Sequence, residues 1–68
     1  MKIKVNGEEK FIPSNKNISL KETMKLLGYS SNTVVVELNN LIINSDEWGT
    51  KYIKDGDKFE IVSIVGGG

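Results

Sequence analysis

Two strand-and-turn patterns, separated by one short helical pattern, constrain the fold of this chain more than any other feature. Residues 1–5 alternate polar and apolar side chains and lead into Asn6-Gly7, the strongest short signal for a hairpin. A return strand through residues 10–12 follows, and Pro13 closes it. Farther along, residues 34–38 have the apolar run of a buried strand, which Asn39-Asn40 turns back into residues 41–43. Each pattern therefore predicts a pair of adjacent strands.

A short helix is predicted between the two pairs. Ser19 and Glu22 have the spacing of a capping box, in which the Ser19 side chain accepts from the Glu22 amide and the Glu22 side chain reaches back. Gly28 supplies a C-terminal stop. The apolar residues of this segment fall on one stripe: Leu20, Met24 and Leu27.

The rest of the chain completes an α+β domain. Residues 45–48 predict a short helical turn, Asp55-Gly56-Asp57 predicts the last turn, and residues 58–65 predict the final strand. Two hairpins with a helix between them favour a mixed sheet of about four to five strands packed on one helix. We expect the first and last strands to be parallel neighbours at its centre, which is the β-grasp arrangement. Residues 1–65 would form this domain, and residues 66–68 a flexible glycine tail.

Alternation along the final strand predicts which side chains face the helix. Lys58, Glu60, Val62 and Ile64 share one face, and Phe59, Ile61, Ser63 and Val65 share the other. The charged residues mark the first face as solvent-exposed. The predicted core therefore comprises Ile3, Val5, Leu20, Met24, Leu27, Val36, Leu38, Phe59 and Ile61. Val62 and Ile64 become an exposed apolar pair before the glycines, which is either ordinary surface or a docking patch for a partner that handles the tail.

Composition excludes several classes of chemistry. The 68 residues contain no cysteine and no histidine, which removes thiolate sites, disulfides and the commonest general base. The 9 basic residues are all lysine and balance 9 acidic residues, so the arginine that usually reads phosphate and base edges is missing. We expect no nucleic-acid role. Residues 1–8 lack the apolar region of a signal peptide and no apolar run is long enough to cross a bilayer, so we expect a cytoplasmic protein without membrane contact.

Other candidate sites have simpler explanations. Asp55-Gly56-Asp57 lacks the further oxygen ligands of a calcium loop and predicts a tight turn. Asp46-Glu47 suits the start of a short helix or plain solvation, and Trp48 most simply closes one end of a small core. We therefore expect no metal site and no cofactor bound by this chain.

The C-terminal segment resembles that of the ThiS family, the sulfur-carrier proteins of thiamine biosynthesis. The resemblance begins with the Asp55-Gly56-Asp57 turn, continues through Glu60-Ile61-Val62 and ends with residues 65–68, VGGG. The block of residues 36–39, VELN, followed by Ile42-Ile43 and Trp48, is also similar to that family. The similarity covers nearly the whole chain. One departure is that Asn44-Ser45 stands where many members carry Pro-Arg, which places in doubt any partner contact made by that arginine.

This resemblance implies a function for the glycine tail. In the family, a ubiquitin-activating-like adenylyltransferase uses ATP and magnesium to adenylate the terminal carboxylate, here that of Gly68. The carboxylate is then converted to a thiocarboxylate, with sulfur from a donor such as a cysteine desulfurase, and thiazole synthase receives the sulfur. The chain would be a protein co-substrate rather than an enzyme, and a monomer when free. Gly66 and Gly67 would thread into the active site, and Val62, Ile64 and Glu60 would contact the partner.

Glycine suits such a tail, although other readings stay open. Without Cβ atoms the three residues form a thin thread, which at about 3.3 to 3.6 Å per residue extends roughly 10 Å beyond the domain. A mobile end or a linker left by cloning gives the same pattern. Two other functions remain as alternatives: the small subunit of molybdopterin synthase, which uses the same thiocarboxylate chemistry, and a ubiquitin-like modifier or binding module.

Overall fold

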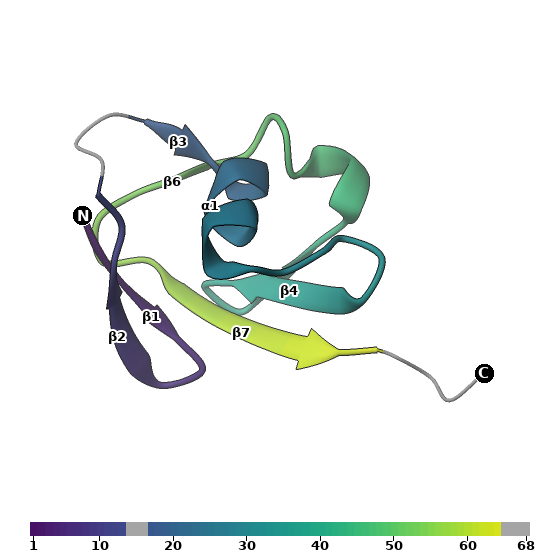
Figure 1. The fold of residues 1–68 in the computed structure, drawn as a ribbon, viewed down its shortest axis with the longest axis horizontal. Coiled ribbons are helices and arrows are strands. Elements are labelled where there is room, and N and C mark those ends of the chain that lie inside the picture. Colours follow the sequence, from purple (N-terminus) through teal and green to yellow (C-terminus); the bar gives the residue numbers. More distant parts are fainter. Residues whose placement is uncertain (14–16, 65–68) are drawn as a thin grey trace.

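A computed structural model of the chain describes residues 1–13 and 17–64 (Figure 1). The elements in chain order are β1 (Lys2–Val5), β2 (Glu8–Phe11), β3 (Ile18–Ser19), α1 (Leu20–Leu27), β4 (Val34–Leu38), β5 (Leu41–Ile43), the short 3-10 helix η1 (Ser45–Glu47), β6 (Tyr52–Ile53) and β7 (Lys58–Ser63).

The main sheet has the predicted β-grasp topology. Its five strands lie in the order β2-β1-β7-β4-β5, and β7 occupies the centre. β1 and β7 are parallel, with Lys4 opposite Lys58 and Val5 opposite Phe59. β7 is antiparallel to β4, and α1 lies over one side of the sheet (Figure 1). The first and last strands are thus neighbours, although β7 alone is central.

Both hairpins turn through residues that tolerate a left-handed backbone. Asn6 and Gly7 have φ angles of 51° and 85°, and Asn39 and Asn40 have φ angles of 50° and 73°. Two successive positive φ angles are the mark of the tight turn that matches the twist of antiparallel strands. The first return strand comprises Glu8–Phe11, slightly earlier than predicted, and Ile12 continues it by donating its amide to the carbonyl oxygen of Met1 at 2.8 Å.

The helix begins and ends at the predicted residues. The Ser19 hydroxyl accepts from the Glu22 amide at 3.1 Å, and Gly28 ends the helix with φ of 88°. The predicted return contact differs: the Glu22 carboxylate accepts from the Ser19 hydroxyl at 3.5 Å instead of from the Ser19 backbone. Thr23 anchors the same turn, because its hydroxyl donates to the Ser19 carbonyl oxygen at 2.8 Å.

The structure has a second, two-stranded sheet that was not predicted from the sequence. Ile18 and Ser19 of β3 pair with Ile53 and Tyr52 of β6, at positions where no strand was predicted. Next to it, the Leu20 amide donates to the Lys51 carbonyl oxygen. The first amides of a helix have no intrahelical acceptor, so the Leu20 amide is available to hold the segment that follows η1 against the helix.

The predicted core is confirmed except at Leu27, which is only partly buried at its edge. Trp48 is buried as expected, and its indole Nε1 donates to the Ile43 carbonyl oxygen at 3.1 Å. The core also contains buried residues outside the predicted list of core residues: Ile12, Ile18, Val34 and Ile53. Within the residues described, no helix has the length and apolarity required to span a membrane.

Candidate functional site

The central strand β7 leads to the predicted site. Its side chains alternate as expected: Phe59 and Ile61 are buried against the helix side, whereas Glu60 and Val62 face the open side of the sheet. The strand ends at Ser63 instead of residue 65. Ile64 is still held, because its amide donates to the Thr33 carbonyl oxygen at 2.8 Å. The chain is thus fixed to the sheet up to Ile64.

The open side of the sheet carries an apolar area at this end. Val62 is 56% exposed and Ile64 is 51% exposed, which confirms the predicted exposed pair. Val62 lies opposite Val35 on β4, and Ile42 on β5, 66% exposed, lies opposite Glu37. We call these four apolar residues the outer-face patch: Val35, Ile42, Val62 and Ile64. Only Val62 and Ile64 were predicted as an exposed pair, because Val35 and Ile42 join them through strand register.

A hollow of about 180 Å³ adjoins the outer-face patch. Ile64, Val35 and Ile42 form part of its wall, together with Asn44, Ser45 and buried Trp48. Asn44 and Ser45 are the positions at which the chain departs from the Pro-Arg of the family pattern. Asn44 and Ser45 therefore lie near Ile64, where the chain continues past the end of β7.

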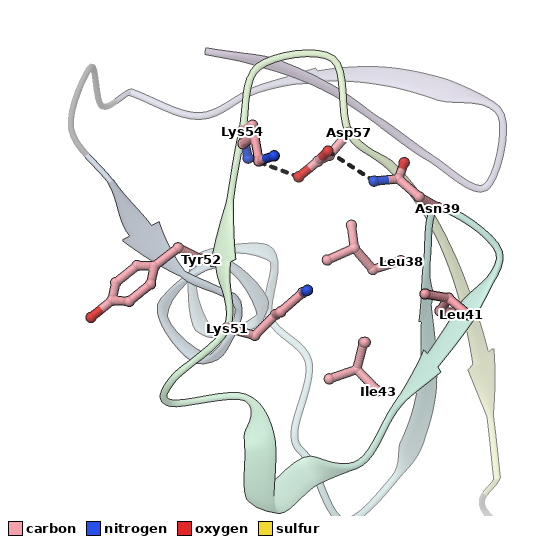
Figure 2. Close-up of a pocket in the computed structure, with 8 residues that line it drawn as sticks. All are labelled: Leu38, Asn39, Leu41, Ile43, Lys51, Tyr52, Lys54 and Asp57. Atoms are coloured by element: carbon pink, nitrogen blue, oxygen red, sulfur yellow. Dashed lines mark hydrogen bonds between the residues drawn. The ribbon is translucent and has the colours of Figure 1, made fainter.

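A polar network fixes the start of β7 (Figure 2). The Asp57 carboxylate accepts from the Lys54 amide at 2.7 Å and from the Asn39 side-chain amide at 3.0 Å. Asn39 Oδ1 in turn accepts from the Lys58 amide at 3.0 Å. Asp55 binds the other side of the turn, where its Oδ1 accepts from the Lys2 amide at 2.7 Å. The predicted tight turn at Asp55-Gly56-Asp57 is confirmed, and the side chains of both aspartates hold it.

The pocket in Figure 2 lies between this turn and the β4–β5 hairpin. It measures about 130 Å³, with Leu38 and Ile43 among its apolar walls and the Lys51 side chain extending across it. Asp57 at its edge already has two donors. Among the described residues, no group of three or more acidic side chains is placed to hold a metal ion.

The glycine residues of the predicted site lie outside the described residues. This applies to Gly66, Gly67 and Gly68, and to Val65 before them. Glu60, Val62 and Ile64 are described and exposed, but their contact with a partner remains a prediction.

Sequence comparison identifies the family. The ThiS family model matches residues 3–68, which includes the glycine tail. The chain belongs to the ThiS family. The uncharacterised protein ycf40 of Trieres chinensis is 38% identical over 64 residues, 94% of this chain and 85% of that protein. A thiazole synthase of Paramagnetospirillum magneticum is 35% identical over 68 residues; the match spans this whole chain and 20% of the synthase.

Solved structures agree with this assignment to the ThiS family. The crystal structure of the thiamine biosynthesis protein ThiS from Geobacter metallireducens superposes with a TM-score of 0.84 at 28% identity, covering 100% of both chains. An NMR solution structure of a thiamine biosynthesis protein from the same organism gives a TM-score of 0.79 at 28% identity, covering 100% of this chain and 88% of that one. The described residues therefore share the ThiS-like β-grasp fold.

Proposed function

We propose that this chain is the sulfur carrier of a thiamine pathway, and that its Gly68 carboxylate carries the sulfur. The observation that carries the proposal is the ThiS family match through residue 68, because it includes the glycines together with the sheet that precedes them. The likeness to a solved ThiS protein over the whole chain supports it. The thiazole synthase that contains a segment similar to this chain supports thiazole synthase as the acceptor.

The chemistry requires activation of the tail. A terminal carboxylate has a pKa of about 3.3 to 3.7, so at neutral pH it is an anion and a poor acyl electrophile. An adenylyltransferase of the ubiquitin-activating type joins it to AMP from ATP, with magnesium, and releases pyrophosphate. The outer sulfur of a persulfide on the donor then attacks the acyl carbon and releases AMP, and a thiol reduces the resulting acyl disulfide, which leaves the thiocarboxylate and a disulfide on the donor. In this scheme the groups that catalyse both steps belong to the partner enzymes, and the chain acts as a co-substrate. ATP and magnesium are bound by the activating enzyme.

The domain and the tail have separate roles in this scheme. β7 is held by its neighbours up to Ile64, which gives the tail a fixed starting point. The outer-face patch beside it offers apolar area to the enzyme that receives the tail. No feature of the described residues favours a molybdopterin synthase subunit or a protein modifier over this function.

Intact mass analysis tests the proposal. The chain is incubated with its organism's activating enzyme, a cysteine desulfurase, cysteine, a reductant and magnesium ATP, and then fragmented. We expect one oxygen replaced by sulfur at Gly68, and no change in a control chain extended by one alanine beyond Gly68. Sulfur on an internal residue, or a chain that stays unmodified under these conditions, would refute the carrier function.

A further inference from the structure

Two glutamates face each other across the centre of the open side of the sheet. In the antiparallel β4–β7 pair, Glu37 lies directly opposite Glu60. Both point away from the core, because their neighbours Val36, Leu38, Phe59 and Ile61 are buried. Directly opposite side chains have Cβ atoms about 4.5 to 5.5 Å apart, and like charges in that position are destabilising. We therefore expect like-charge repulsion between these two carboxylates in the free protein.

No lysine that the structure describes forms an ion pair with either glutamate; the pair found is Lys2 with Glu9, at 3.1 Å. Lys58 is on the same face, two residues before Glu60, but the residue opposite it on β1 is Lys4, another cation. The open side of the sheet is thus divided along β7 into a cationic end, an anionic centre and the outer-face patch.

The glutamate pair and the outer-face patch form one continuous surface. On the same face of the sheet, the next pair along β4 and β7 is Val35 with Val62. Ile42 on β5 is directly opposite Glu37. Glu37 is next to Ile42 across the strands, and Glu60 is two residues from Val62 along β7 on the same face, so a protein that covers Val62 and Ile42 also reaches both carboxylates. Removing an unpaired carboxylate from water is costly unless a cation and hydrogen bonds replace the water.

We infer that the partner enzyme presents an arginine side chain that sits between the carboxylates of Glu37 and Glu60 while apolar groups cover the outer-face patch. A guanidinium has five donors in a fixed plane, so one group can bond both carboxylates, whereas a lysine ammonium is a point charge. The charge of the pair is complementary to such a group, and binding removes the repulsion present in the free chain. This inference rests on the proposed function for the identity of the partner. The role of Glu37 and the arginine of the partner are additional to that function.

The inference predicts opposite effects on stability and on binding. In Glu37→Gln and Glu60→Gln, loss of one charge relieves the repulsion, and the thermal midpoint should rise by about 2 to 6 °C. Affinity for the activating enzyme or thiazole synthase should fall about tenfold or more, because the arginine loses a charged partner. A merely structural role for the glutamates would move both quantities in the same direction.

The experiment is calorimetric titration of the full chain into each enzyme, with thermal unfolding of the same variants. Glu8→Gln is the matched control: it removes the same charge at an exposed residue of β2, away from the outer-face patch, and should change binding less than about twofold. Gln variants that bind like the wild type would overturn this inference alone. A wild-type chain that binds neither enzyme would overturn it together with the proposed function. Replacing the arginine found opposite the pair in a crystal of the complex should reproduce the loss.

Discussion

The side chain of Asn6 bonds both backbone groups of Ile61. Asn6 Oδ1 accepts from the Ile61 amide at 2.7 Å, and Asn6 Nδ2 donates to the Ile61 carbonyl oxygen at 3.2 Å. β1 ends at Val5, so this side chain occupies the place that the next strand residue would take beside β7. It extends the support of β7 toward the tail.

We predict that Asn6→Gly destabilises the protein. Glycine keeps the left-handed backbone at this turn, so the main loss is the two hydrogen bonds, which leaves the Ile61 amide and carbonyl without their protein partner. The free energy of unfolding should fall by about 1 to 3 kcal/mol, measured by urea denaturation.

Asn40→Gly is the control for this prediction. Asn40 also has a positive φ angle, 73°, but no side-chain hydrogen bond is found for it. Its replacement should change the free energy of unfolding by less than about 1 kcal/mol. Equal losses in the two variants would show that the backbone, and not the Asn6 amide, accounts for the effect.

Asp57 should matter more to stability than Asp55. Asp57 is 9% exposed and accepts from two donors, so Asp57→Ala leaves the Lys54 and Asn39 donors without a partner. We expect a loss of about 2 to 3 kcal/mol. Asp55 is exposed and accepts one bond, so Asp55→Ala should cost about 0.5 to 1.5 kcal/mol. Denaturant midpoints of the two variants in the same buffer give the ranking, and the reverse order would contradict it.

The sequence was sufficient where local chemistry decides the structure. Asn6-Gly7 and Asn39-Asn40 form turns because asparagine and glycine accept positive φ angles. Ser19 and Gly28 bound the helix for equally local reasons. The exposure of Val62 followed from alternation along one strand, and the glycine tail with the turn before it indicated the family.

Some pairing of strands that are distant along the chain could not be predicted from the sequence. β3 and β6 have two residues each, too few for any periodic signal, and they form because Ile18 and Ile53 pair across the chain. Ile42 and Glu37 reach the candidate surface only through the register of β4 with its two neighbours. Leu27 was placed in the core by helical periodicity, but it lies near the end of the helix, where it is only partly covered.

Loss of the Phe59 ring should unfold much of the protein. Phe59 is fully buried at the centre of the sheet, and Phe59→Ala should cost about 3 to 5 kcal/mol. A domain of this size has about 3 to 10 kcal/mol of total stability. Circular dichroism and thermal melting measure the effect.

Alanine variants of two leucines in α1 serve as comparisons for Phe59→Ala. Leu26→Ala should be nearly neutral, because Leu26 is 58% exposed, whereas Leu27→Ala should fall between Leu26→Ala and Phe59→Ala. An unchanged thermal midpoint for Phe59→Ala would show that the faces of β7 are assigned wrongly.

Deleting Gly67 and Gly68 should separate folding from activation. The deletion removes no residue of the described sheet, so the thermal midpoint should stay within about 2 °C of the wild type. ATP–pyrophosphate exchange by the activating enzyme should vanish at every carrier concentration, because the shortened tail no longer brings a carboxylate to ATP. Exchange at the wild-type rate would show that the terminal glycines are not the substrate.

Val62→Asp and Ile64→Asp should give a different defect. The Gly68 carboxylate remains, but a charge replaces an apolar side chain at the outer-face patch and loses solvation when the enzyme covers it. Because only ground-state binding is weakened, the apparent KM for the carrier should rise about tenfold or more while kcat changes little. Steady-state exchange against carrier concentration distinguishes the two defects, and Leu26→Asp, an equally exposed position on α1, is the control. If Leu26→Asp raises KM as much as Val62→Asp does, added charge alone explains the loss and the outer-face patch is not the docking surface.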